Sequence, residues 1–172
     1  MAKGKGKRKQ ADAEPTGPAR ILIVNDEDGA SELISRLLTG AGYAVDRAGT
    51  HDAAIVALNA GHADCILLDL ATGGIGQNLK LLDAVRGHPD EQIANARVVL
   101  VAHQTNNRLF SWQAGIDAFL LRPFHADELL RDIEEVLARP DDERTRHRRR
   151  ELDAASNEGR TIDARPWETR RF

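Results

Sequence analysis

The sequence predicts an α/β domain in which a five-stranded parallel sheet is doubly wound by helices, a (βα)5 arrangement. Five short apolar segments alternate with five segments of helical periodicity over residues 20–139. Strands that are separated by helices must pair in parallel through right-handed crossovers. The strands are apolar throughout rather than at alternate positions, which indicates a sheet that is covered by helices on both faces.

The strands are predicted from short apolar or β-branched runs. The first, Ile21 to Val24, is the clearest of them. The predicted strands are residues 20–25, 43–46, 64–68, 97–101 and 117–121.

The helices are predicted from apolar side chains at helical spacing and from residues that end helices. Thr50 is a candidate N-cap, and the glycines Gly40, Gly61 and Gly115 stop three of the segments. The last helix has the most regular apolar face, formed by Leu129, Leu130, Ile133, Val136 and Leu137. The predicted helices are residues 29–40, 51–60, 76–86, 105–114 and 125–138.

The two ends of the chain differ from this body in composition. Residues 1–19 are basic, contain no apolar period and are predicted to be a disordered tail. Residues 140–172 are charged and are predicted to be partly helical or disordered, the mostly disordered interpretation being favoured. A helix over residues 141–155 would carry Arg144, Arg146 and Arg148 to Arg150 on its surface, and Trp167 and Phe172 are unusual in a tail.

Charge and composition exclude several classes of function. Residues 20–139 hold 10 basic and 17 acidic residues, so the body has a net charge of −7 and is a poor partner for nucleic acid. No apolar run approaches the roughly 20 residues that span a bilayer, and no secretory signal is recognisable, so a cytoplasmic location is expected. Cys65 is the only cysteine and lies in an apolar run, which predicts a packed thiol and excludes a disulfide within the chain.

Polar residues follow the predicted strands, where the binding sites of open parallel sheets lie. Asn25 to Asp28 follow the first strand, Asp69 the third and Arg122 the fifth, while Val101 to His103 follow the fourth. Clustered carboxylates favour a hard cation such as Mg²⁺. A carboxylate beside Mg²⁺ and a cationic side chain can attack a phosphoryl group in line, so the arrangement predicts phosphorylation of an aspartate.

These residues and their order resemble the receiver domain of bacterial response regulators, over about residues 20–139. Four stretches carry the resemblance: Ile21 to Asp28, Cys65 to Leu70, Gly115 to Phe124, and Asp127 to Leu130. The resemblance implies a fold like that of the single-domain chemotaxis regulators, with the flavodoxin-like strand order 2-1-3-4-5.

The resemblance also assigns roles to individual positions. Asp69 would be the phospho-acceptor. Asp26 and Asp69 would hold Mg²⁺ together with the backbone carbonyl of Ala71, and Asn25 would act through a water. Arg122 replaces the family lysine that contacts the phosphoryl group, and Phe119 occupies the aromatic switch position.

Five features depart from the family pattern, and one of them is the missing phenolic hydroxyl at Phe119. Asn25 removes one negative charge, so we expect a weaker Mg²⁺ affinity, which Glu27 or Asp28 is able to offset. Val101 lacks the hydroxyl that usually contacts the phosphoryl group, and Thr72 is a speculative substitute. Arg122 keeps the charge but not the geometry of lysine. The loop from Ala71 to Gly76 contains three glycines and is one residue longer than usual.

The main hypothesis is a two-component receiver that takes a phosphoryl group on Asp69 from a histidine kinase or phosphotransfer protein. Its output would be contact with a downstream protein, or a homodimer, through the fourth helix, fifth strand and fifth helix, with no membrane partner. It would not be an enzyme beyond its own phosphorylation and dephosphorylation. The alternative is a pseudo-receiver that binds proteins without phosphorylation. An enzyme or nucleotide-binding site on the same fold is a third possibility, which the absence of a phosphate-binding glycine motif after the first strand disfavours.

Overall fold

The computed structural model describes residues 17–163 of the chain, with side chains for residues 17–158. Five strands form one sheet: β1 (Arg20–Val24), β2 (Ala44–Ala48), β3 (Cys65–Asp69), β4 (Arg97–Ala102) and β5 (Ala118–Leu121). Their order is β2-β1-β3-β4-β5 and every pairing is parallel. The predicted fold class and strand order are therefore confirmed.

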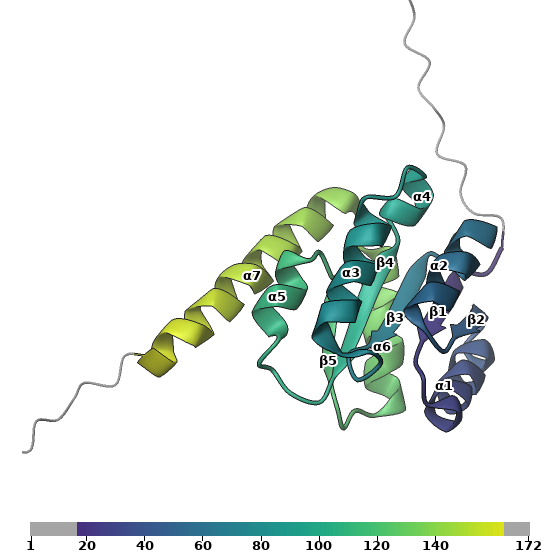
Figure 1. The fold of residues 1–172 in the computed structure, drawn as a ribbon, viewed down its shortest axis with the longest axis horizontal. Coiled ribbons are helices and arrows are strands. Elements are labelled where there is room, and N and C mark those ends of the chain that lie inside the picture. The colour runs from purple at the N-terminus through teal and green to yellow at the C-terminus, as the bar shows by residue number, and fades with distance from the viewer. Residues whose placement is uncertain (1–16, 164–172) are drawn as a thin grey trace, which may run out of the picture.

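In the described part of the chain, seven helices surround the sheet (Figure 1). Five correspond to predicted segments: α1 (Asp28–Gly40), α2 (His51–Ala60), α3 (Gly74–Arg86), α5 (Arg108–Gln113) and α6 (Ala126–Ala138). The short helix α4 (Glu91–Ala94) was not predicted, because four residues are too few to show a helical period. α7 (Asp141–Asp163) is much longer than expected.

The sheet is covered on both faces, as the apolar strands predicted. Alternate residues of β1 enter two different apolar clusters: Leu22 and Val24 pack with α2 and α3, whereas Ile21 and Ile23 pack with α1 and α6. Cys65 is fully buried in the second cluster, and burial raises the pKa of its thiol to about 12. The prediction of a packed, unreactive cysteine agrees with this environment.

The C-terminal helix agrees with the helical alternative for residues 141–155 and extends it to Asp163, rather than the favoured, mostly disordered interpretation. α7 crosses α5 and extends beyond the body of the domain (Figure 1). Ala155 is buried, Leu152 packs against the core, and the rings of Trp112 and His147 meet edge to face at 5.7 Å. Residues 1–16 and 164–172, with Trp167 and Phe172, lie outside the described part of the chain.

Two arginines of α7 also differ from the prediction that they lie on the helix surface. Arg144 is only 6% exposed, and Arg148 is partly buried. Both side chains bind the carboxylate of Asp117 at the start of β5. Asp117 is therefore a buried ion-pairing residue. Within residues 17–163, no helix has the length and apolar character needed to cross a bilayer.

Candidate phosphorylation site

Asp69 lies at the carboxyl end of β3, the central strand of the sheet, and is 6% exposed. One carboxylate oxygen, Oδ1, accepts the backbone N–H of Ala71 at 3.0 Å. The other, Oδ2, accepts the side-chain amide of Asn25 at 3.0 Å and forms an ion pair with Arg122. Three segments that are distant in sequence thus meet at one carboxylate, as expected for the ends of parallel strands.

Asn25 contacts Asp69 in a way that the sequence did not predict. Its Nδ2 donates to Asp69, while its Oδ1 accepts the backbone N–H of Glu27 at 2.7 Å. The side chain therefore acts as a donor to the phospho-acceptor position, and its oxygen is already hydrogen-bonded. A carboxylate at this position would repel Asp69, whereas the amide donates a hydrogen bond to it.

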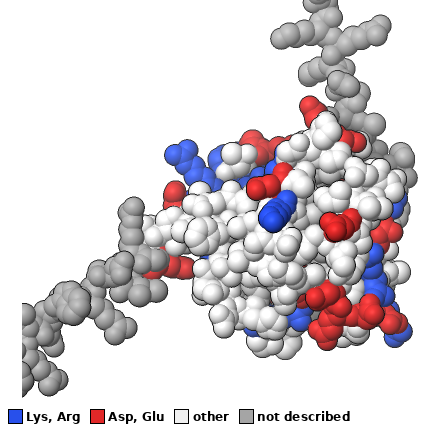
Figure 2. All heavy atoms as spheres, in the orientation of Figure 1, with Lys and Arg blue, Asp and Glu red and all other residues white. Residues whose placement is uncertain are grey.

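Asp26 is exposed and is joined to the loop that follows β3. The hydroxyl of Thr72 donates to Asp26 Oδ1 at 3.1 Å and accepts the backbone N–H of Asp26 at the same distance. Figure 2 shows acidic side chains gathered in this orientation over the region of α1, where Glu27 and Asp28 are also exposed. Asp28 lies 3.5 Å from Arg47, which partly balances its charge.

The loop after Asp69 is fixed by a buried side chain. Asn78 is 0% exposed, and its Nδ2 lies within hydrogen-bonding distance of the carbonyl oxygens of Leu70, Thr72 and Gly74, at 3.2, 3.0 and 2.7 Å. Gly73 and Gly74 have φ values of +69° and +72°, which favour glycine over residues with a side chain. The three-glycine loop therefore has a defined anchor in α3.

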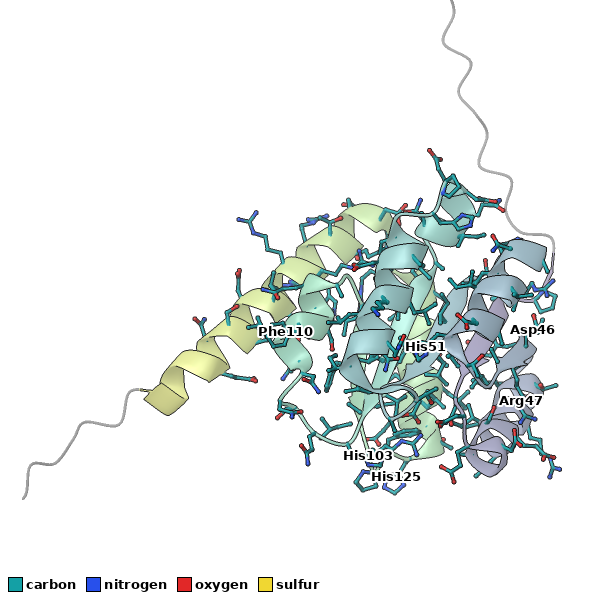
Figure 3. The ribbon with its side chains drawn as sticks, in the orientation of Figure 1. Asp46, Arg47, His51, His103, Phe110 and His125 are labelled. Carbon is teal, nitrogen blue, oxygen red and sulfur yellow. The ribbon has the colours of Figure 1, made fainter. Side chains whose placement is uncertain are left out.

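Arg122 lies between Asp69 and the partly buried ring of Phe124. Its guanidinium carbon is 5.9 Å from the centre of the Phe124 ring. Arg122, Pro123 and Phe124 form a shallow groove with His103, and Figure 3 places His103 near His125 at the same end of the molecule. His103 is therefore close to the site, as its position after the fourth strand predicted.

Val101 lies within β4 rather than after it, and Phe119 lies within β5. Val101 pairs with Asp69 across β3 and β4, is 1% exposed and packs with the apolar cluster under α1 and α6. Thr72, the speculative substitute for the missing hydroxyl, is instead bound to Asp26. Phe119 is partly buried and lines a cavity of about 180 Å³ between α5, α6 and α7.

The donor set at Asp69 is suited to a cation that keeps several of its waters. Among residues 17–163, no group of three histidine, cysteine or acidic side chains is arranged to hold a metal. Asp26 and Asp69 nevertheless offer two carboxylates beside the exposed residue Ala71, whose backbone has a carbonyl oxygen. Mg²⁺ is typically bound by one or two carboxylates and otherwise by water, so these residues fit Mg²⁺ better than a metal that needs a full protein shell.

Asn78 and His51 were not identified from the sequence. His51 Nε2 and Asn78 Oδ1 are 3.3 Å apart, joining α2 to α3 beside the loop (Figure 3). The only signal was asparagine, a poor helix former, in the first turns of a helix whose start contains the glycines of the loop. That signal is equally typical of an exposed asparagine, so only the structure reveals the burial.

Comparison with known proteins agrees with this geometry. The family model described as the response regulator receiver domain matches residues 21–134. The transcriptional regulatory protein DltR of Streptococcus agalactiae is 33% identical over 115 residues, which is 66% of this chain and 50% of DltR. ResD of Bacillus subtilis, also named a transcriptional regulatory protein, is 29% identical over 127 residues, 73% of this chain and 51% of ResD.

Solved structures match over a similar range. A putative response regulator from Chloroflexus aurantiacus is 28% identical with a TM-score of 0.64, and the match covers 71% of this chain and 99% of that one. TrrA of Thermotoga maritima, solved in complex with Mg²⁺ and beryllofluoride, is 27% identical with a TM-score of 0.59, over 69% and 98% of the two chains. The chain spans about half the length of the curated relatives it matches. It belongs to the response regulator receiver domain family.

Proposed function

We propose that Asp69 accepts a phosphoryl group from a phosphohistidine of a histidine kinase or phosphotransfer protein. The observation that carries the proposal is the environment of the Asp69 carboxylate. It is buried at the end of the central strand, yet its partners are one arginine, one side-chain amide and one backbone N–H. These groups place a positive charge and N–H donors at the carboxylate without surrounding it, which suits a nucleophile that accepts a negatively charged group.

The reaction is a transfer between nitrogen and oxygen. An oxygen of Asp69 attacks phosphorus, the bond between phosphorus and the histidine nitrogen breaks, and the imidazole leaves with the electron pair and takes a proton from solvent. Asp26, Asp69 and the Ala71 carbonyl would hold Mg²⁺, which would supply positive charge to the phosphoryl oxygens. Arg122 already contacts the acceptor and is able to follow the charge to the phosphoryl group.

The partners and location belong to the same proposal. The output face expected from the sequence corresponds to α5, β5 and α6, and α7 lies across α5. A downstream protein or a second copy that uses this face would therefore also contact α7. A cytoplasmic location and an unlikely role for nucleic acid remain predictions. The chain is proposed to be a phospho-acceptor rather than an enzyme acting on a separate substrate.

The test is the intact mass of the protein after incubation with Mg²⁺ and acetyl phosphate. We expect one added phosphoryl group, absent from Asp69→Asn and present in Asp83→Asn, which changes an exposed aspartate of α3. No added mass in the wild type, with no Mg²⁺-dependent binding of beryllofluoride, would overturn the proposal and favour a phosphorylation-independent interaction module.

A further inference from the structure

We propose that Thr72 positions Asp26 for the divalent cation and that Asn78 keeps Thr72 in place. This inference rests on the cation site of the proposed function. It gives a role to the loop from Ala71 to Gly76, which differs from the family pattern.

The hydroxyl of Thr72 fixes one end of Asp26. It donates to Oδ1 of the carboxylate and accepts the backbone N–H of the same residue, both at 3.1 Å. Oδ1 is thereby occupied and Oδ2 is left for a cation. Thr72 is 3% exposed although Asp26 is exposed, so a buried hydroxyl orients a carboxylate that solvent would otherwise leave free to rotate.

The backbone of Thr72 is tied to both sides of the site. Its N–H donates to the backbone carbonyl of Asp69 at 3.1 Å, and its own carbonyl accepts from Asn78 at 3.0 Å. Thr72 therefore connects the acceptor strand, the second carboxylate and α3. If Thr72 moved, the position of the Asp26 carboxylate relative to the Asp69 carboxylate would change.

Asn78 is suited to hold the loop because its amide is completely buried. The carbonyls of Thr72 and Gly74 are the nearest acceptors of its two amide hydrogens, and His51 Nε2 faces its oxygen. The His51 ring also packs against Gly73, where a Cβ atom would lie 2.7 Å from His51 Cε1. The loop is thus confined between α2 and α3, and it needs both glycine and asparagine to adopt this path.

The positioning matters because Asn25 leaves Asp26 as the one acidic side chain of the pair that follows β1 in the family pattern. With one charge fewer, the affinity for a cation depends more on how well the remaining carboxylates are oriented. Hydrogen bonds that orient metal ligands typically change metal affinity by about 10- to 100-fold. We therefore expect the Thr72 hydroxyl to change the affinity by about tenfold, the lower end of that range, because the site is open to water.

The first experiment compares Thr72→Val with Thr72→Ser and the wild type. Binding of Mn²⁺, used as the probe cation, is followed by the electron paramagnetic resonance signal of the free ion. Thr72→Val keeps the shape but removes the hydroxyl, so we expect Mn²⁺ affinity to fall about tenfold. Thr72→Ser should retain most of the affinity. Thermal unfolding without metal checks that each variant is folded.

The second experiment asks whether Asn78 acts through Thr72. Asn78→Ala should weaken Mn²⁺ binding, and the double variant Thr72→Val with Asn78→Ala should bind no more weakly than Thr72→Val alone, because two residues that act through one contact are not additive. If the loss of Mn²⁺ affinity in the double variant equalled the product of the two single losses, the role of Asn78 would be overturned.

Two outcomes would separate this inference from the proposed function. Equal Mn²⁺ affinity of Thr72→Val and the wild type would overturn the inference even if Asp69 is phosphorylated. A Thr72-dependent cation site in a protein that acetyl phosphate does not modify would support the inference and contradict the phospho-acceptor. Absence of Mn²⁺ binding by the wild type would overturn the inference.

Discussion

Asp69 and Asp117 are buried aspartates at opposite ends of the same parallel sheet. Asp69 is the last residue of β3, whereas Asp117 directly precedes β5. Their exposures are similarly low, at 6% and 1%. They differ in the number of arginine side chains that contact them. Among the described residues, Asp69 has one such contact and is proposed to react, whereas Asp117 has three and stabilises the fold.

Asp117 is surrounded by positive charge. Its carboxylate contacts Arg86, Arg144 and Arg148, and it also accepts the backbone N–H of Val98 at 2.9 Å. Burial by itself would raise the pKa of Asp117, but the hydrogen bond from Arg144 and the charge of Arg148 outweigh it and hold the pKa below its ordinary value. This carboxylate is saturated with donors and is inaccessible to a reactant.

Asp69 has one cation and faces an acidic neighbourhood. Arg122 is its only ion-pair partner among the described residues, and that side chain is 22% exposed. Asp26, Glu27 and Asp28 are exposed and directly follow Asn25, which contacts Asp69. Burial alone therefore does not identify an aspartate as structural. The number of positive charges that contact the carboxylate distinguishes the structural Asp117 from the potentially reactive Asp69.

The largest expected effect is on the stability of Asp117→Asn. Three arginines would lose their shared carboxylate, and breaking a buried ion pair from one side typically destabilises by about 3–5 kcal/mol. The free energy of unfolding in urea measures the change. Asp83→Asn, on the exposed face of α3, serves as the control with the same chemical change. If Asp117→Asn lost no more free energy of unfolding than this control, Asp117 would not be the structural residue that the contrast with Asp69 requires.

A smaller effect is expected in α7, where Arg144 and Arg146 form a matched pair. Arg144 is buried against Asp117, whereas the side chain of Arg146 is 67% exposed and pairs only with Asp142 among the described residues. Arg144→Ala should destabilise the protein by about 2–3 kcal/mol, since it removes charged hydrogen bonds. Arg146→Ala should change stability by less than about 0.5 kcal/mol.

Hydrogen exchange tests where in the protein the loss of Arg144 acts. Arg144→Ala should increase exchange of the α7 amides more than of those in β3, because Arg144 anchors the helix to Asp117. Equal exchange in the two arginine variants would show that the ion pairs with Asp117 do not hold α7 on the domain.

The sequence pattern predicted the parallel sheet and the strand ends near Asp69, and the resemblance to receiver domains predicted the strand order and the roles of individual residues. Apolar strands and helical periods are local patterns, and the ends of parallel strands meet by topology, so Asp26, Asp69 and Arg122 were placed without coordinates. The direction in which Asn25 donates was not predictable. An amide offers a donor and an acceptor, and only the backbone N–H of Glu27 determines which of them faces Asp69.

The role of α7 was missed because its sequence is unusually polar. Its arginines suggested a solvated helix or a disordered tail, and no period distinguishes Arg144 and Arg148 from Arg146 and Arg150. The partner that buries them, Asp117, lies 27 residues before Arg144. Ion pairing between residues that are distant in sequence produces no local pattern. An apolar helix face would have produced a periodic one.

The smallest expected effect is on the stability of Asp69→Asn, the same substitution as Asp117→Asn at the opposite end of the sheet. The change should alter the free energy of unfolding by about 1 kcal/mol or less without metal, because it releases one partly exposed arginine and reduces repulsion with Asp26. Urea unfolding with and without Mg²⁺ measures it. The cation should stabilise the wild type, since it binds the folded state, and should stabilise Asp69→Asn much less. A loss as large as that of Asp117→Asn would mean that Asp69 is mainly a structural residue, and the contrast between the two ends of the sheet would no longer hold.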